Sequence, residues 1–278
     1  MKLSLAGSLL VLTLLAGCGS GSLFGGEDEV PIEDRSATEI FAQAEAEMAE
    51  GNYEEAAETF DEVERLFPFS QLAKRAMMMS AFASYQGGDM PSARASANRF
   101  LDLYPSDADA PYAQYLIALT WYDNIVDVGR DQATTQNALQ ELQELVRRYP
   151  ESDFARDAEL KIDLTRNHLA GKEMTVGRYY LKRGHYTAAI NRFREVLEEY
   201  QTTSHTPEAL HRLVEAYLAL GLEREAQVVA AVLGENFVGS DWYARSYALL
   251  TDRHLLPASR DDSFFDTVYR RVILGEWL

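Results

Sequence analysis

The sequence contains a single cysteine, Cys18, among 278 residues. Without a second thiol, the chain cannot form an internal disulfide. Positive charge is also scarce, because 26 Lys and Arg residues face 44 Asp and Glu residues, which gives a formal net charge of −18. Nucleic-acid binding needs a basic footprint for the phosphates, so no nucleic-acid partner is expected. The same balance disfavours broad contact with anionic lipid headgroups, so attachment to a membrane would have to be apolar.

The chain has one strongly hydrophobic run, residues 3–15, which follows Met1-Lys2 and precedes Ala16-Gly17-Cys18. A short cationic start, an apolar stretch and small residues before a cut are typical of a signal peptide. The run is shorter than the roughly 20 apolar residues of a membrane-spanning helix. Residues 15–18, "LAGC", resemble the bacterial lipobox, in which the cysteine is lipidated and becomes the N-terminus. The alternative is an ordinary signal peptide with an incidental cysteine.

The lipobox resemblance implies a signal peptide at residues 1–17 and a lipid anchor on Cys18. Residues 18–35 are rich in glycine and acidic side chains, which predicts a flexible tether. Gly19 stands where lipoproteins retained in the inner membrane commonly carry aspartate. The resemblance therefore implies a protein held at the periplasmic face of the outer membrane, with no cofactor beyond the covalent lipid.

No strand pattern is visible in the rest of the chain, where apolar residues recur at helical spacing. Three segments share one pattern: glycine, a bulky residue two positions on, alanine at five, and apolar residues at nine and twelve. They are "GNYEEAAETFDEVERLFP" (51–68), "GDMPSARASANRFLDLYP" (88–105) and "GHYTAAINRFREVLEEYQ" (184–201), with weaker copies around Ala138 and Ala226. The pattern resembles the tetratricopeptide repeat, a helix pair of about 34 residues.

The fold class expected is all-α, a tetratricopeptide solenoid of five helix pairs. Uneven repeat spacing predicts a loop at 122–135, between repeats two and three, and a long helix within 153–184 that separates repeats three and four. This helix is expected to bend near Gly171 or Gly177. The N-terminal half would span 36–152, the long helix and C-terminal half 153–252, and a capping helix 253–278. Gln201 replaces the proline that ends the sibling repeats, so the following turn is expected to differ.

No motif of an enzyme is visible: the sequence has no HExxH, P-loop, GxGxxG or GxSxG pattern. His205 and His211 lack thiol or carboxylate partners at supporting spacing, so no metal site is expected. A hydrolytic enzyme would need paired buried carboxylates or a Ser/His set. Neither is visible in the sequence, so we expect no catalytic residues.

Aromatic residues are frequent in the second and third repeats, beyond the positions that the repeat itself requires. They are Tyr85, Tyr112, Tyr115, Trp121 and Tyr122. One interpretation is packing between repeats. The other is a groove that binds an extended peptide, because aromatic side chains are favoured anchors in binding.

Five such repeats behind a lipobox resemble the BamD family, the lipoproteins of the beta-barrel assembly machinery (BAM). The most similar stretch is "RNHLAGKEMTVGRYYLKRGHYTAAINRF" (166–193), supported by "FPFS" (67–70), "DVGRDQ" (127–132) and "RRYP" (147–150). The likeness covers essentially the whole mature chain and is greatest to alphaproteobacterial members. It implies a scaffold without catalysis, whose partners are the POTRA domain of BamA nearest the membrane, other BAM lipoproteins and the C-terminal signals of unfolded outer-membrane proteins.

Within this resemblance, Asn191 and Arg192 match an Asn-Arg pair of the family whose arginine is associated with BamA. Arg192 precedes the inward position of Phe193 and is expected to be exposed, able to reach a partner's carboxylate. The alternative is an internal ion pair with Glu195 or Glu199. A tetratricopeptide lipoprotein of cell division or of secretin or pilus assembly is the alternative function.

Overall fold

The computed structural model describes residues 31–259 and 269–270. The chain divides into two units, residues 1–36 and 37–278. The described part of the first unit contains a 3₁₀ turn, η1 (Ile32–Asp34). Cys18, the signal segment and most of the tether lie outside the described residues, so their expected roles stay predictions.

The second unit is built from α-helices, and the described residues contain no strand, which confirms the all-α prediction. The helices are α1 (Ala37–Glu50), α2 (Tyr53–Leu66), α3 (Gln71–Gln86), α4 (Met90–Leu103), α5 (Ala110–Tyr122), α6 (Ala133–Arg148), α7 (Asp153–Lys182), α8 (Tyr186–Glu199), α9 (Thr206–Ala219), α10 (Glu223–Phe237) and α11 (Asp241–Thr251). The first ten form five consecutive pairs, as the repeat pattern predicts.

Four of the five pairs turn on a glycine in the left-handed region of the backbone. This conformation lets the chain reverse within two or three residues, and a side chain would strain it. The φ angles are 85° at Gly51, 83° at Gly88, 76° at Gly184 and 75° at Gly221. The repeated glycine of the sequence pattern is therefore explained by the turn between the two helices of each pair.

Four of the five second helices, α2, α4, α6 and α8, end in the same way whether or not a proline follows. α2 ends before Phe67 and Pro68, and α8 ends before Tyr200 and Gln201. The cap residues Phe67 and Tyr200 have similar φ values of −131° and −130°. The carbonyl of Gln201 accepts a hydrogen bond of 2.8 Å from the Thr206 hydroxyl, which holds the turn without proline. The expectation that this turn differs is therefore wrong at the helix end.

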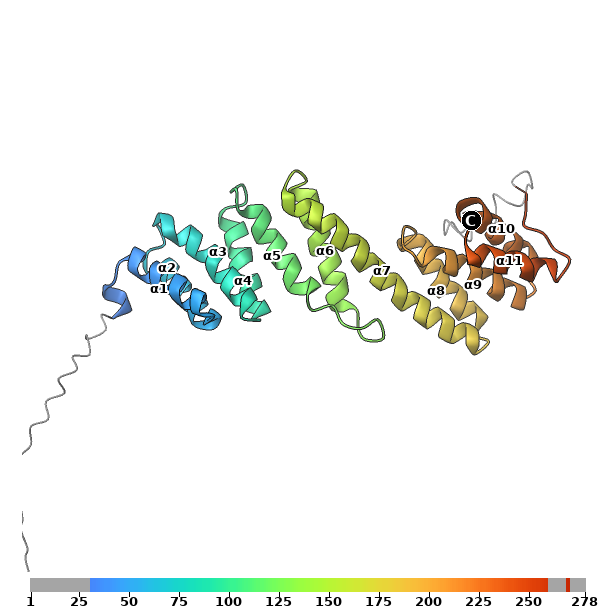
Figure 1. Ribbon diagram of the computed structural model, residues 1–278, viewed down its shortest axis with the longest axis horizontal. Coiled ribbons are helices and arrows are strands. Elements are labelled where there is room, and N and C mark those ends of the chain that lie inside the picture. Colours follow the sequence, from blue (N-terminus) through green and yellow to red (C-terminus); the bar gives the residue numbers. More distant parts are fainter. Residues whose placement is uncertain (1–30, 260–268, 271–278) are drawn as a thin grey trace, which may run out of the picture. The chain divides into compact units, whose positions relative to one another are not determined.

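Each helix packs against the next one along the chain (Figure 1). The first helices of successive pairs also contact one another, from α1 to α3, α5, α7, α9 and then α11. Because the first helices approach each other in this way, they form a continuous layer. Residues on that layer from different repeats can thus contribute to one surface.

The loop between α5 and α6, residues 123–132, lies inside the third helix pair. The expectation of a loop between repeats two and three is thus wrong in its placement, because residues 110–122 form the first helix of repeat three. The loop is fastened to α7, since the Lys172 ammonium donates to the carbonyls of Gly129 at 3.1 Å and Arg130 at 3.2 Å. The insertion is a packed element of the third pair.

Helix α7 contains 30 residues and is about 45 Å long at 1.5 Å per residue. Its N-terminal part contributes Ala158 to a core shared with α5 and α6. Its C-terminal part contributes Ala170 and Met174 to the core of α8, α9 and α10. One continuous helix therefore belongs to the hydrophobic cores of both halves.

Only a part of the segment expected to form the capping helix is described. Residues 253–259 are not helical, whereas Tyr269 and Arg270 are. The Tyr269 side chain packs against the C-terminal core. Residues 260–268 and 271–278, where most of the expected capping helix falls, lie outside the described residues.

Gly177 is a point of close approach between α7 and α8. A Cβ atom on Gly177 would overlap the ring of Phe193, which is fully buried. Alanine is favoured over glycine in a helix by about 1 kcal/mol, but overpacking typically costs about 1–3 kcal/mol. We expect Gly177→Ala to lower the free energy of unfolding by about 1 kcal/mol, measured by urea denaturation.

The matched control is Gly171→Ala in the same helix. A Cβ there meets a side-chain nitrogen, Nε2 of His205, at 3.3 Å. We expect this variant to be as stable as the parent chain or slightly more stable. Equal stability of the two variants would contradict the packing role of Gly177.

Candidate functional site

The aromatic residues singled out in the sequence lie on α3 and α5, and all five are half-buried. Tyr112, Tyr115 and Tyr122 lie on one side of α5, as their spacing of three and seven residues requires. The ring of Phe154, in the first turn of α7, lies 5.3 Å from that of Tyr112 and 5.2 Å from that of Tyr115. We call the surface formed by Tyr85, Tyr112, Tyr115, Tyr122 and Phe154 the tyrosine face.

Charged groups of α7 join the tyrosine face. The Tyr115 hydroxyl donates to Asp157 at 2.5 Å, and the Lys161 ammonium donates to the same carboxylate at 2.6 Å. That ammonium also lies 5.3 Å from the centre of the Tyr122 ring and 5.8 Å from that of Tyr115. A cation at this distance is attracted electrostatically to the face of an aromatic ring.

These contacts determine the protonation states on the tyrosine face. Burial and the hydrogen bond to Asp157 raise the pKa of Tyr115, so its hydroxyl is a donor at neutral pH. Lys161 and Tyr115 lower the pKa of Asp157, which stays ionised. Burial, followed by the hydrogen bond to Asp123, raises the pKa of Tyr85. The face thus presents neutral phenols beside fixed charges.

Trp121 is separate from this arrangement. The Arg94 guanidinium of α4 lies 4.0 Å from the centre of the Trp121 ring and donates to the Thr120 hydroxyl at 3.2 Å. The tryptophan is therefore held against α4 by a cation–π contact. Four of the five aromatic residues selected from the sequence share one surface, and Trp121 does not.

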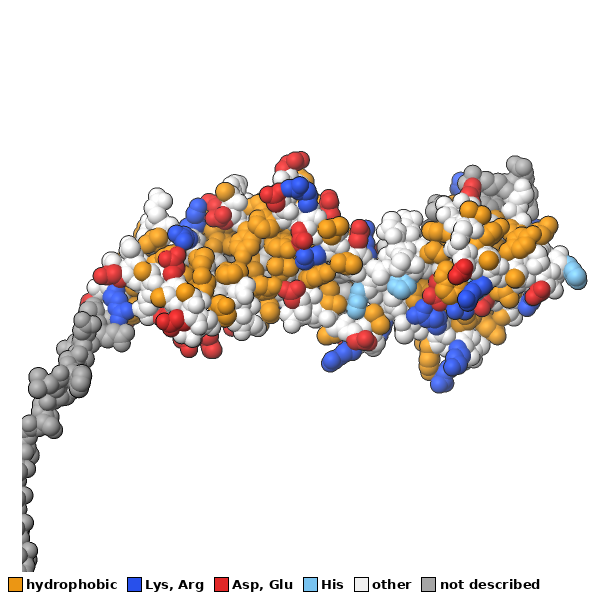
Figure 2. Space-filling view, in the orientation of Figure 1, with side chains coloured by type: hydrophobic (Ala, Val, Ile, Leu, Met, Phe, Trp, Pro, Cys, Tyr) orange, Lys and Arg blue, Asp and Glu red, His pale blue; other side chains and the backbone are white. Residues whose placement is uncertain are grey.

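Hydrophobic side chains gather over α3 and α5 on the side of the molecule shown in Figure 2. Each ring of the tyrosine face is half-buried, so part of it is accessible to solvent. Such a surface can hold an extended peptide by stacking and by hydrogen bonds to phenols and carboxylates. Packing between repeats and peptide binding are compatible uses of the same rings.

Three residues of this surface were not selected from the sequence: Phe154, Asp157 and Lys161. They recur at spacings of three and four residues at the start of α7, which is the signal that could have identified them. Their sequence separation from α5 conceals the contact, since only the packing of α5 against α7 brings the two helices together.

Arg192 lies on the exposed side of α8, and Phe193 beside it is fully buried, as the repeat predicts. The guanidinium forms an ion pair of 3.0 Å with Glu173 of α7, and 46 % of the arginine side chain is exposed. The internal partner is thus Glu173 rather than the expected Glu195 or Glu199, because α7 runs directly beside α8.

The surroundings of Arg192 are acidic. Burial raises the pKa of Glu195, and the nearby carboxylates of Glu173 and Glu199 raise it further. Asn191 beside Arg192 is exposed. One guanidinium and one amide therefore lie in a patch of carboxylates that repel each other.

Of the two histidines weighed as metal ligands, His211 contacts a hydroxyl and a carboxylate, and His205 is partly buried. His211 Nδ1 lies 2.8 Å from the Ser246 hydroxyl, and its Nε2 lies 3.6 Å from Glu215. Burial is the main cause that lowers the pKa of His205. No group of three or more His, Cys, Asp or Glu among the described residues could hold a metal ion.

None of the helices within residues 31–259 is both long and apolar enough to cross a bilayer.

Comparison with known proteins places this architecture in a family. A family model for YfiO, described as an outer membrane lipoprotein, matches residues 33–232. Three curated relatives are each named outer membrane protein assembly factor BamD. The Caulobacter vibrioides protein is 46 % identical over 90 % of this chain and 81 % of its own length. The Rickettsia prowazekii protein is 39 % identical over 90 % of this chain and 98 % of its own length. A Neisseria meningitidis protein is 32 % identical over 80 % of this chain and 86 % of its own length. The chain therefore belongs to the YfiO family of outer membrane lipoproteins.

Proposed function

We propose that this chain is a scaffold subunit of the beta-barrel assembly machinery and has no catalytic activity of its own. It would help to fold and insert beta-barrel proteins into the outer membrane from the periplasmic side. The observation that carries the proposal is the match along residues 33–232, together with relatives that are named assembly factors over most of both chains.

The patch around Arg192 suits the contact with the POTRA domain of a BamA-type protein. A surface ion pair contributes only about 0–1 kcal/mol, so Arg192 can exchange Glu173 for a partner's carboxylate at little cost. The guanidinium offers a planar fork that binds a carboxylate through two hydrogen bonds. Asn191, exposed beside it, can add an amide hydrogen bond.

The tyrosine face suits the C-terminal signals of unfolded outer-membrane proteins, which end in an aromatic residue. Its half-buried rings can stack on such a residue, and Lys161 lies close enough to Tyr115 and Tyr122 to meet a terminal carboxylate. Reception of the unfolded chain and contact with the barrel subunit would then use different repeats. Other BAM lipoproteins would bind the remaining surface.

Depletion of this protein in its native bacterium tests the proposed function. We expect folded beta-barrel proteins to disappear from the outer membrane, measured by quantitative mass spectrometry and by heat-modifiable migration. Outer-membrane lipoproteins without a barrel provide the control and should stay constant. Unchanged barrel levels after full depletion would contradict the proposal.

Arg192→Glu should weaken binding to the POTRA domains of the cognate BamA-type protein by about 10- to 100-fold, measured by biolayer interferometry. A loss of 10- to 100-fold corresponds to about 1.4–2.8 kcal/mol, the lower part of the cost of losing one partner of a close interfacial charge pair, because Arg192 is half-exposed and the reversed charge would repel the partner's carboxylate. Thermal unfolding should stay within about 2 °C, since surface substitutions change stability little.

Arg65→Glu is the matched control. Like Arg192, Arg65 is an exposed arginine on the second helix of a pair (α2), and it forms an ion pair with Glu62. We expect its affinity to equal that of the parent chain. Equal affinities for the Arg192 and Arg65 variants would rule out Arg192 as a contact with this partner.

A further inference from the structure

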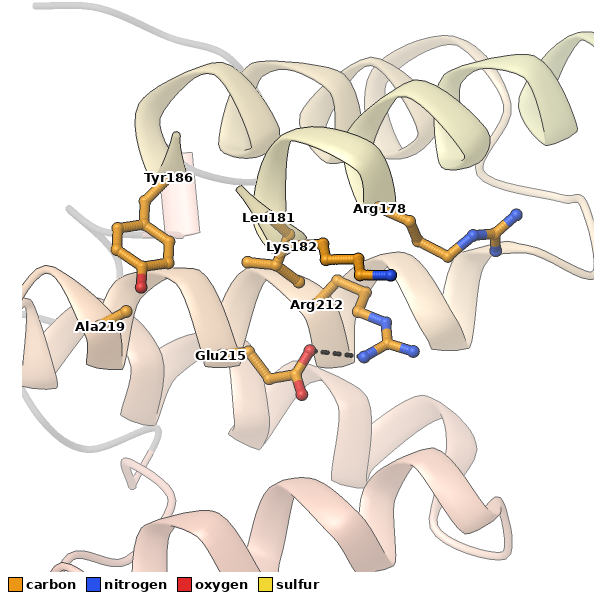
Figure 3. A pocket seen from close by; sticks show the side chains of 7 residues that line it. All are labelled: Arg178, Leu181, Lys182, Tyr186, Arg212, Glu215 and Ala219. Atoms are coloured by element: carbon orange, nitrogen blue, oxygen red, sulfur yellow. Dashed lines mark hydrogen bonds and ion pairs between the residues drawn. The ribbon is translucent and has the colours of Figure 1, made fainter. Parts of the chain in front are cut away.

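A cavity of about 440 Å³ lies between α7, the start of α8 and α9 (Figure 3). Its lining combines cationic and apolar side chains: Arg178, Leu181, Lys182, Tyr186, Arg212, Glu215 and Ala219. We call it the basic pocket. A concentration of cations is unusual in a chain whose formal net charge is −18.

The basic pocket has two chemically different ends. Figure 3 shows the charged groups of Arg178, Lys182 and Arg212 toward one end, and Tyr186 and Ala219 toward the other. Leu181 lies between them. The pocket can therefore receive a negatively charged group and an adjacent apolar group together.

The two guanidinium groups are held in place by carboxylates. Arg178 pairs with Glu208 at 2.9 Å, and Arg212 pairs with Glu208 at 3.2 Å and with Glu215 at 2.7 Å. Although burial acts to raise the pKa of Glu215, its contacts with His211 and Arg212 hold that pKa below the ordinary value. The network is thus ionised at neutral pH and fixes the positions of both arginines.

Lys182 in the pocket lining and Arg245 on the adjacent helix α11 are not part of this ion-pair network. Arg212 and Arg245 lie 5.3 Å and 5.1 Å from the centre of the Trp242 ring on α11. Neither Lys182 nor Arg245 forms an ion pair with any residue that the structure describes. The three cations of the lining, Arg178, Lys182 and Arg212, therefore outnumber the two carboxylates, Glu208 and Glu215, that pair with the arginines.

The basic pocket is distinct from the Arg192 patch. On α7, Glu173 pairs with Arg192, whereas Arg178 pairs with Glu208 of α9. Five residues correspond to about 140° around a helix, so Glu173 and Arg178 point in different directions. The pocket is lined mainly by α7 and α9, which belong to the layer of first helices.

We propose that the basic pocket binds an acidic segment of a partner polypeptide, with a carboxylate at Lys182 and Arg212 and a neighbouring apolar side chain against Leu181 and Tyr186. The overall acidity of the chain disfavours an anionic membrane surface as the occupant, because a broad charged surface would be repelled. A single acidic segment meets only the local positive field. This binding site goes beyond the assembly function and does not depend on it.

The test uses the full chain and a short fluorescein-labelled peptide of alternating glutamate and phenylalanine. The comparison peptide has glutamine at every glutamate position. In low salt, we expect fluorescence anisotropy to show at least tenfold tighter binding of the glutamate peptide. Lys182→Glu should weaken that binding about tenfold, because it reverses the uncompensated charge without removing an ion pair.

Arg156→Glu is the matched control, since it makes the same charge change on the same helix, roughly 39 Å away along α7. We expect it to leave the affinity within about twofold. Replacing the peptide's glutamates by lysine should restore binding to the Lys182 variant. Equal binding of the glutamate and glutamine peptides, or equal losses in the Lys182 and Arg156 variants, would overturn the proposal. Binding to phosphatidylglycerol vesicles in preference to the peptide would overturn it as well.

Discussion

Phe193→Ala should lower the free energy of unfolding of the C-terminal helices by about 3–5 kcal/mol. The Phe193 side chain is fully buried where α8 meets Gly177 of α7, and truncating a buried phenylalanine leaves a cavity as well as losing burial. Urea denaturation followed by circular dichroism measures the change in midpoint.

The loss should be confined to part of the chain. In a solenoid each repeat contacts mainly its neighbours, so stability is a sum of local contributions. Trp121 lies on α5 and Trp242 on α11, so tryptophan fluorescence of single-tryptophan versions reports the two halves separately. We expect the Trp242 transition to move to lower urea and the Trp121 transition to stay nearly constant.

Phe69→Ala is the matched control for this substitution. Phe69 is fully exposed in the turn before α3, so its removal should change the free energy of unfolding by less than about 0.5 kcal/mol. Equal losses for Phe69→Ala and Phe193→Ala would contradict the assigned core.

Cys18→Ala should release the protein from membranes into the soluble fraction. Each buried methylene of an acyl chain contributes about 0.8 kcal/mol, so several chains on Cys18 would dominate membrane attachment. Cell fractionation followed by immunoblotting measures the distribution, which should change from almost wholly membrane-bound to almost wholly soluble.

Gly19→Asp separates anchoring from sorting. Aspartate after the lipidated cysteine is typical of lipoproteins retained in the inner membrane, so this variant should stay membrane-bound but move to the inner-membrane fraction of a sucrose gradient. Membrane retention of the Cys18 variant at the parent level would contradict lipid anchoring.

The helix pairs could be predicted from the sequence because their signals are local. Gly51, Gly88 and Gly184 mark turns that require a positive φ, and the alanine and aromatic positions that follow them face the core. The wide spacing between the third and fourth repeats also predicts a long helix there, and α7 has 30 residues.

The surfaces could be predicted only in part, because they depend on contacts between distant helices. The sequence identified Tyr112 and Tyr115 but not Phe154, since nothing in the local pattern shows that α7 passes alongside α5. Arg192 was correctly expected to be exposed, yet its partner lies 19 residues away on the preceding helix. The basic pocket likewise combines residues of α7 and α9, and helical periodicity alone cannot show which faces meet.

Purification of the tagged protein from its native envelope in mild detergent, with mass spectrometry of the bound proteins, would identify the proteins that it binds in the cell. We expect a POTRA-bearing outer-membrane barrel to be the main partner, and other lipoproteins of the assembly machinery to accompany it. Recovery of cell-division or secretin components in place of that barrel would contradict the assembly function, while leaving the helix-pair fold intact.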